Sequence, residues 1–151
     1  MAENMKDLPI GYEFPAASYV MTQERMTIYT DMVQSCTEGP AGVLRIAPSN
    51  IHNDLEFAKG QGLPAPIGDG VIMTAWAETE LRKRFGVGYM KGGRLMNKFI
   101  KPVFAGDTVA IKFTIKDKVP QGEATKLVMD VNMYNQKGDL VVVGEAAALV
   151  K

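Results

Sequence analysis

The stretch from Ser49 to Phe85, SNIHNDLEFAKGQGLPAPIGDGVIMTAWAETELRKRF, organises the rest of the chain. It holds the only histidine of the protein, His52. Pro64 and Pro66 exclude helix around them, and the sequence then becomes strongly helical from Val71 to Phe85. We expect the turns to bring His52 towards the start of this helix, where free backbone N–H groups and a partial positive charge can hold a developing oxyanion.

Asp69 is a typical N-cap for that helix. The first two turns are apolar nearly all round, and the last turns are polar on one side. Such a helix is buried at its start and emerges at its end. The segment from Val71 to Phe85 is therefore predicted to be the buried central helix, with Trp76 mostly inaccessible to solvent. Gly86 and Gly88 are predicted to terminate it.

Shorter elements precede the central helix. Thr22 resembles an N-cap, and apolar residues at helical spacing predict an amphipathic helix over Gln23–Gln34. The other expected elements are a short strand at Ser18–Met21, an extended piece at Val43–Ile46 and a short helix within Asn53–Gln61.

After the central helix the apolar period changes to two, which is typical of strands with one buried face. Short turns rich in glycine, asparagine and aspartate separate these segments, so we expect an antiparallel meander. The fold class is α+β, a curved antiparallel sheet wrapped around a central helix. The predicted strands are Leu95–Val103, Thr108–Lys116, Leu127–Met133 and Leu140–Val150.

Composition limits the function classes. The 151 residues suit one domain over residues 1–151, and equal numbers of basic and acidic residues, 17 each, argue against a nucleic-acid binder. The single cysteine, Cys36, excludes an internal disulfide framework and fits a reducing compartment. No apolar run approaches the roughly 20 residues of a membrane span, and no signal segment is recognisable. We expect a cytoplasmic protein without a metal or cofactor.

Three motifs carry a resemblance to a known family: Ile51–Asp54, Pro66–Gly70 and Phe99–Thr108. Their order resembles that of the MaoC-like (R)-specific enoyl-CoA hydratases and dehydratases, which have the hot-dog fold. The resemblance implies a lyase acting on an acyl-thioester of coenzyme A or of a carrier protein. It also implies a homodimer or larger homo-oligomer, and it leaves open a heteromer with an active homologue.

The family's catalytic pair is an aspartate and a histidine in a pattern similar to Asp-x-Asn-Pro-x-His. By position the histidine is His52, while Ser49 and Asn50 replace the asparagine and the proline. The aspartate position holds Ala47, which cannot transfer a proton. The usual mechanism with two groups is therefore not available unless another carboxylate replaces the missing one.

Asp69-Gly70 stands where the family often has His-Gly, and Gly70 matches the glycine whose N–H polarises the thioester carbonyl. The catalytic candidates are thus His52, Gly70, and either Asp54 or Asp69 as the second carboxylate. Each carboxylate also has an ordinary interpretation, as a residue that starts or caps a helix.

Substrate-binding candidates are Arg45, Asn50, Trp76 and Arg94, and Lys98 and Lys101 can also contact coenzyme A phosphates. Solvated surface charges are the alternative for the basic residues. Met26, Met32 and Met73 are interpreted as core, although methionines also suit a pocket for a variable acyl chain.

Three functions remain open from the sequence. The first is a hydratase or dehydratase with His52 as base. The second is a thioesterase in which Asp69 or His52 activates water. The third is a non-catalytic acyl-thioester-binding subunit, in which alanine at position 47 has replaced the catalytic aspartate and the active site has been lost.

Overall fold

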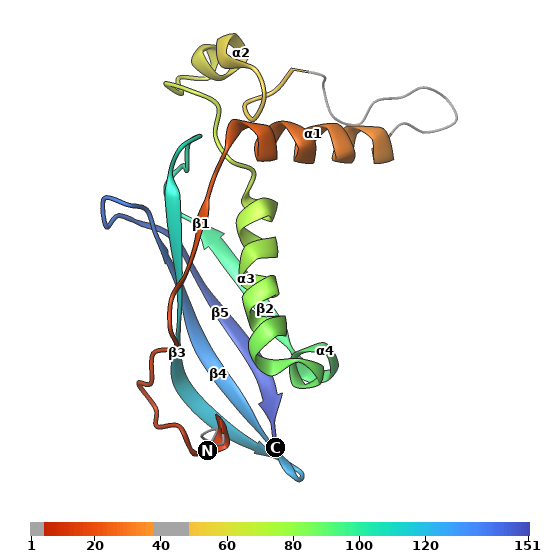
Figure 1. The fold of residues 1–151 in the computed structure, drawn as a ribbon, viewed down its shortest axis with the longest axis vertical. Coiled ribbons are helices and arrows are strands. Elements are labelled where there is room, and N and C mark those ends of the chain that lie inside the picture. The colour runs from red at the N-terminus through yellow and green to blue at the C-terminus, as the bar shows by residue number, and fades with distance from the viewer. Residues whose placement is uncertain (1–4, 38–48) are drawn as a thin grey trace.

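The structure is a computed structural model that describes residues 5–37 and 49–151. The predicted extended piece Val43–Ile46, together with Arg45 and Ala47, lies outside the described residues. After a short 3₁₀ turn at Met5–Asp7, the described chain forms one antiparallel sheet and a set of helices (Figure 1).

The five strands are all antiparallel and pair in the order β1-β3-β4-β5-β2, so the predicted antiparallel sheet is confirmed. The predicted meander holds for β3, β4 and β5, but β2 pairs with β5 rather than with β3. The predicted strand Leu95–Val103 ends at Phe99, because the N–H groups of Ile100 and Lys101 both donate hydrogen bonds to Val141 O. The predicted strand Thr108–Lys116 continues beyond Lys116, because a bulge there lets the strand bend. The strands are β1 (Ala17–Val20), β2 (Arg94–Phe99), β3 (Thr108–Gln121), β4 (Ala124–Tyr134) and β5 (Leu140–Val150).

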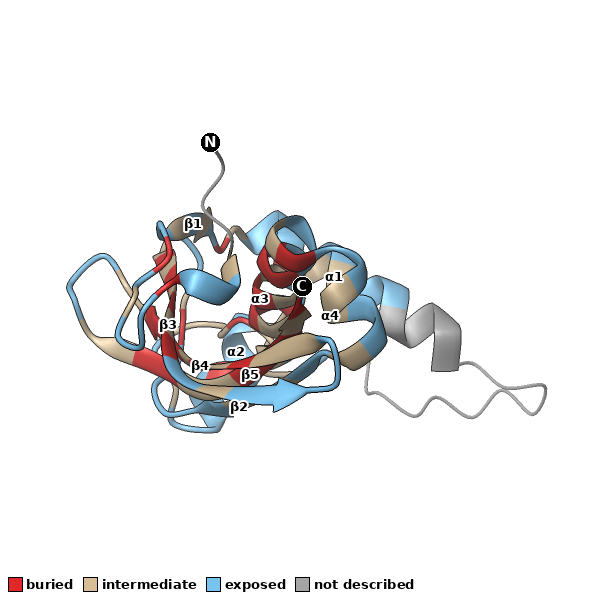
Figure 2. Ribbon diagram, turned by 90° about the horizontal axis from the view of Figure 1, so that it is seen from below, coloured by how far each residue is buried: buried red, intermediate tan, exposed pale blue. Residues whose placement is uncertain are grey.

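Helix α3 (Gly70–Phe85) lies along one face of this sheet, and the buried residues gather between the two (Figure 2). The core is made by alternate residues of β3, β4 and β5 facing one side of α3. The buried positions of the helix recur at helical spacing over its whole length: Ile72, Met73, Ala77, Glu80, Leu81 and Phe85.

The prediction that α3 is buried at its start and emerges at its end is therefore wrong. Val71, in its first turn, is 53% exposed, whereas Phe85, its last residue, is buried. The pattern arises because one side of α3 meets the sheet over the whole length of the helix. Trp76 is partly buried and stacks on Tyr19, with ring centroids 5.1 Å apart, rather than lying inside the core.

Helix α1 (Gln23–Thr37) begins as predicted, with Thr22 Oγ1 accepting a hydrogen bond from Arg25 N. It leaves the sheet near the start of α3 (Figure 1). Its apolar residues are divided accordingly: Met26 is fully buried, but Met32 is 54% exposed, so Met32 does not belong to the predicted core.

Two short helices complete the fold, α2 (Leu55–Gly60) and α4 (Val87–Gly92). Helix α2 lies within the segment predicted to be helical. Helix α4 was not predicted, because Gly88 was interpreted as a terminator. A side chain at Gly88 would instead place its Cβ within 1.9 Å of Leu149 O, so glycine is required for α4 to pack on β5.

Candidate active site

The loop that carries His52 is held by its own polar groups and by the segment before α3. Asn50 Oδ1 accepts a hydrogen bond from His52 N at 2.8 Å, and Ile67 N donates to Ile51 O at 3.0 Å. His52 Nδ1 lies 2.8 Å from Ile67 O. A carbonyl oxygen only accepts hydrogen bonds, so Nδ1 carries the proton and the neutral ring presents Nε2 as an acceptor.

Asp69 has two roles, one for each carboxylate oxygen. Oδ1 accepts a hydrogen bond from Val71 N at 2.8 Å and caps α3, as predicted. Oδ2 lies 3.5 Å from His52 Nε2. The His52 and Asp69 side chains are 23% and 29% exposed, so the pair can be reached from solvent.

Gly70 is the first residue of α3, and its N–H has no acceptor within the described part of the chain. The ring of Phe99 covers it closely. A Cβ added at Gly70 would lie 2.6 Å from this ring, so glycine allows Phe99 to lie against the helix start.

His52 and Gly70 line one cavity of about 410 Å³ between the start of α3 and the segment after β2. The sequence predicted that these two residues face one pocket, and the geometry places them so. Lys101 also lines the cavity, and its Nζ is 2.7 Å from Asp139 Oδ1. The other lining residues are mainly apolar: Leu63, Ile67, Gly68, Met73, Phe99, Ile100, Pro102 and Val103.

Tyr29 is a polar neighbour of the pair that sequence reasoning missed as a site residue. Burial raises the pKa of its phenol, and the negative charge of Asp69 raises that pKa further. Its helical spacing from Met26 indicated a buried face of α1 but gave no sign of which carboxylate it would approach.

Tyr29 lies in a groove of about 340 Å³ between α1 and α3. The groove is separate from the His52 cavity and shares no lining residue with it. Its other residues are Arg25, Ile28, Met32, Val71, Ile72, Ala75 and Trp76.

The remaining candidates lie elsewhere. Asp54 Oδ1 accepts a hydrogen bond from Phe57 N at 3.0 Å, which caps α2 and lowers the pKa of Asp54. Neither Asp54 nor Asp69 is among the residues that line the His52 cavity, but Asp69 lies 3.5 Å from the His52 ring, so the geometry favours capping over catalysis for Asp54. Trp76 and Arg94 do not line that cavity either, and Asn50 acts on the backbone of His52.

Residues 48–135 match the family of MaoC-like domains. The chain belongs to this family. No curated protein sequence matches it.

Solved structures with the MaoC-like fold extend the likeness over nearly the whole chain. A monoamine oxidase regulatory protein from Archaeoglobus fulgidus is 21% identical, with 97% of this chain and 93% of that chain covered and a TM-score of 0.74. An (R)-hydratase from Pseudomonas aeruginosa is 19% identical, with coverages of 97% and 84% and a TM-score of 0.68. At these low identities, the structural similarity shows the hot-dog fold alone.

A third MaoC-like structure is a complex of two different chains, described as a 3R-hydroxyacyl-ACP dehydratase from Mycobacterium tuberculosis. It is 19% identical, with coverages of 95% and 98% and a TM-score of 0.62. Within residues 5–37 and 49–151, no helix is long and apolar enough to cross a membrane, and no cluster of side chains has the composition of a metal site.

Proposed function

We propose that this MaoC-like protein is a hydratase or dehydratase that adds water to an enoyl-thioester or removes it from a 3-hydroxyacyl-thioester. The observation that carries the proposal is the approach of His52 Nε2 to Asp69 Oδ2, 3.5 Å apart, beside a cavity that His52 shares with Gly70. Asp69 takes the place of the carboxylate that Ala47 cannot supply.

The hydrogen bond to Ile67 O defines the chemistry of the pair. It leaves Nε2 as an acceptor, and the ionised Oδ2 is also an acceptor, so the two do not satisfy each other. A water molecule can donate one hydrogen to each. In hydration, this water attacks the β-carbon, and Nε2 takes its proton. The adjacent Asp69 carboxylate stabilises the imidazolium that forms, and this imidazolium then returns a proton to the α-carbon.

Gly70 supplies the second part of the mechanism. As the β-carbon is attacked, negative charge develops on the thioester oxygen. The N–H of Gly70 points from the positive end of α3 and has no acceptor of its own among the described residues. Such a preorganised donor stabilises the enolate-like oxygen without reorganisation. The apolar walls of the cavity suit an acyl chain, and Lys101 at its edge suits the polar carrier arm.

The test is whether the protein hydrates crotonyl-, hexenoyl- and decenoyl-CoA. The reaction is monitored by the loss of the enoyl absorbance. His52→Gln should lower turnover by about 10²-fold or more with folding intact. Gln23→Ala is a matched control, since Gln23 donates to the backbone oxygen of His52 and to Thr27 Oγ1, each at 3.4 Å, and does not line the cavity. A wild-type protein that binds these thioesters without hydrating them would support a non-catalytic subunit instead.

A thioesterase is the second candidate, because Asp69 lies at the start of α3, where a carboxylate can activate water against a thioester carbonyl. The same panel separates the two reactions when free thiol is measured alongside the enoyl absorbance. Release of thiol without hydration would assign the site to hydrolysis.

We also propose that the protein assembles through its sheet edge, as a homodimer or with a related chain. Strand β2 ends the sheet and has no neighbour on its outer side among the described strands. Met96, Phe99 and Ile100, on or just after it, are 43–54% exposed. Unpaired apolar edges are normally covered.

A further inference from the structure

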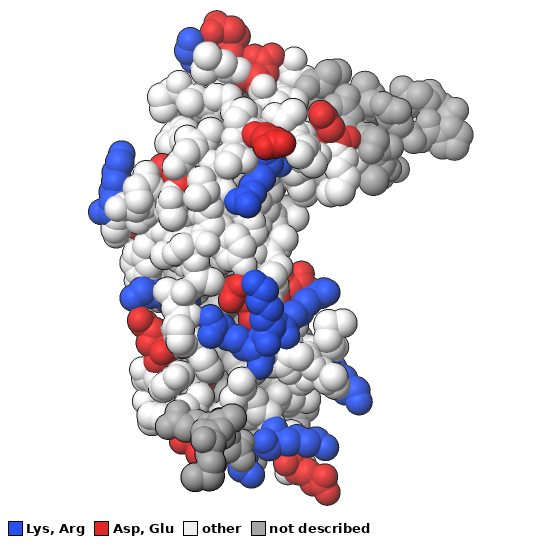
Figure 3. Space-filling model, viewed as in Figure 1, with Lys and Arg blue, Asp and Glu red and all other residues white. Residues whose placement is uncertain are grey.

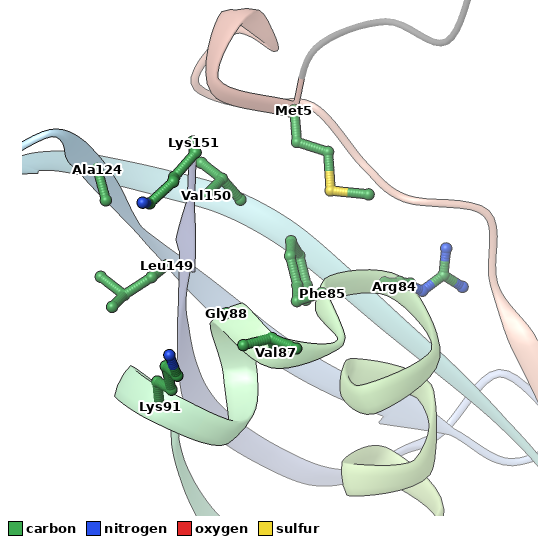
Figure 4. A pocket seen from close by; sticks show the side chains of 10 residues that line it. All are labelled: Met5, Arg84, Phe85, Val87, Gly88, Lys91, Ala124, Leu149, Val150 and Lys151. Atoms are coloured by element: carbon green, nitrogen blue, oxygen red, sulfur yellow. The ribbon is translucent and has the colours of Figure 1, made fainter.

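A second cavity lies at the C-terminal end of α3, at the opposite end of this helix from Gly70 (Figure 4). Its volume is about 600 Å³, larger than the cavity at His52 and within the range of small-molecule sites. The two cavities share no lining residue. It is lined by Met5, Arg84, Phe85, Val87, Gly88, Lys91, Ala124, Leu149, Val150 and Lys151.

The walls of this cavity are fixed. Gly88 and Gly92 face Leu149, and a Cβ on either would lie within 2.5 Å of it, so α4 is pressed onto β5. Phe85 and Val150 are each 8% exposed and belong to the main core. The side of the cavity that α4, β5 and the end of α3 form is therefore preformed.

The charged side chains that line the cavity are all basic. Arg84, Lys91 and Lys151 line it, whereas no aspartate or glutamate does. Lys91 makes no ion pair within the described part of the chain. Figure 4 shows Lys91 and Lys151 on the same side of the cavity, with Leu149 between them.

Arg84 lies at the edge of the cavity, and its guanidinium points away from Lys91 and Lys151 (Figure 4). Its guanidinium donates to Pro15 O at 2.6 Å and lies 3.5 Å from Glu80 Oε2. Its Nε is buried and has no acceptor in the described structure.

We propose that this cavity binds an amphipathic anion, namely a straight-chain fatty carboxylate. Its tail would lie against Phe85, Val87 and Leu149, and its carboxylate would lie at Lys91. An uncharged apolar ligand would leave the cations without a partner, and a small anion would leave the apolar walls wet. A molecule with both parts satisfies both features.

The test is titration of the full chain with dodecanoate, below its micelle concentration, by isothermal calorimetry. One molecule should bind per chain. Lys91→Glu should weaken binding by about tenfold or more, because it replaces a charge-assisted contact with repulsion. Lys137→Glu is the matched control, since Lys137 is exposed in the turn between β4 and β5 and does not line the cavity. Dodecan-1-ol should bind as weakly to wild type as dodecanoate does to Lys91→Glu.

A variant that fills the cavity tests where the apolar tail of the ligand binds. Ala124→Phe should abolish binding, and Leu63→Trp, which fills the His52 cavity, should leave it unchanged. Shortening the chain should weaken binding by up to about fourfold for each CH₂ removed. Equal affinities for Lys91→Glu and Lys137→Glu would overturn the proposal. So would the absence of binding to wild type, or its loss in Leu63→Trp rather than Ala124→Phe.

Discussion

His52 Nε2 and Asp69 Oδ2 lie 3.5 Å apart, although the two residues are 17 positions apart along the chain. The bridge is Ile67: its carbonyl oxygen accepts from His52 Nδ1, and its N–H bonds to Ile51 O. The segment before α3 therefore fixes both the tautomer of the histidine and its distance from the carboxylate.

Substitutions at Asp69 separate its two roles. Asp69→Asn keeps an oxygen that can cap α3, so the midpoint of thermal unfolding should hardly change, whereas turnover should fall by about 10²-fold. Asp69→Ala should lose the same activity and also about 1 kcal/mol of stability. Hydration rates and thermal melts of both variants check this. Full activity in Asp69→Asn would remove the carboxylate from the mechanism.

Asp69→Asn should also change the pKa of Tyr29. The carboxylate charge disfavours tyrosinate and, after burial, helps to raise the pKa of Tyr29. Removing the charge should therefore lower this pKa, while burial keeps it above the ordinary value. NMR titration of a single labelled tyrosine reads the shift directly. Asp54→Asn is the matched control, since Asp54 is not among the causes of the Tyr29 shift.

Gly70→Ala tests the packing of the helix start. Alanine favours the helix by up to about 1 kcal/mol, but its Cβ would lie 2.6 Å from the Phe99 ring, which must move. Stability should stay within about 1 kcal/mol of wild type, whereas kcat/KM should fall by at least about tenfold, since small displacements in a site are costly. A crystal structure of the variant should show Phe99 displaced. An unmoved ring with full activity would contradict this account.

The sequence predicted the sheet well because alternation of apolar residues reports directly which face of a strand is buried. It predicted α3 but not its exposed side. Val71 and Trp76 look like core residues by type, and only the position of the sheet decides that Val71 is exposed and Trp76 lies at the margin of the core. Helix α4 was missed because the close contact of Gly88 with Leu149 is a tertiary constraint that no local pattern contains.

The candidate site was predictable in part for the same reason. Motif order placed His52 and Gly70 together, and the helix-cap position of Asp69 followed from its residue type. The choice between Asp54 and Asp69 needed three dimensions, because both precede helices and both cap them. Only one of the two caps points its second oxygen at His52.

Glu80 is a buried carboxylate whose charge affects stability. Burial alone would raise its pKa, but the hydrogen bonds from Tyr19 and Lys83 and the charge of Arg84 outweigh it, so the pKa is lowered. A carboxyl with a lowered folded pKa stabilises the fold above its unfolded pKa, near 4.3, and this contribution is lost as pH falls through the folded pKa.

Glu80→Gln should therefore cost on the order of 1–3 kcal/mol at pH 7, and the difference from wild type should shrink as the pH falls below about 4. Urea unfolding at several pH values measures this. Glu56→Gln is the control, because the Glu56 side chain is 82% exposed and its pair with Lys59 is at the surface. A difference that grows on acidification would reverse the assigned sign.

The two edges of the sheet allow a test of assembly. Strand β1 has four residues and β2 has six, and short edges are themselves protected from pairing. Both edges also expose large apolar side chains: Val20 at 43% on β1, and Met96 at 54% and Phe99 at 46% on β2. Assembly through β2 predicts sedimentation at twice 16.5 kDa or more for wild type and for Val20→Asp. Met96→Asp should shift the equilibrium to a 16.5 kDa monomer, because a desolvated carboxylate at the interface has no partner. A wild-type monomer at micromolar concentration, or dissociation by Val20→Asp alone, would exclude pairing through β2.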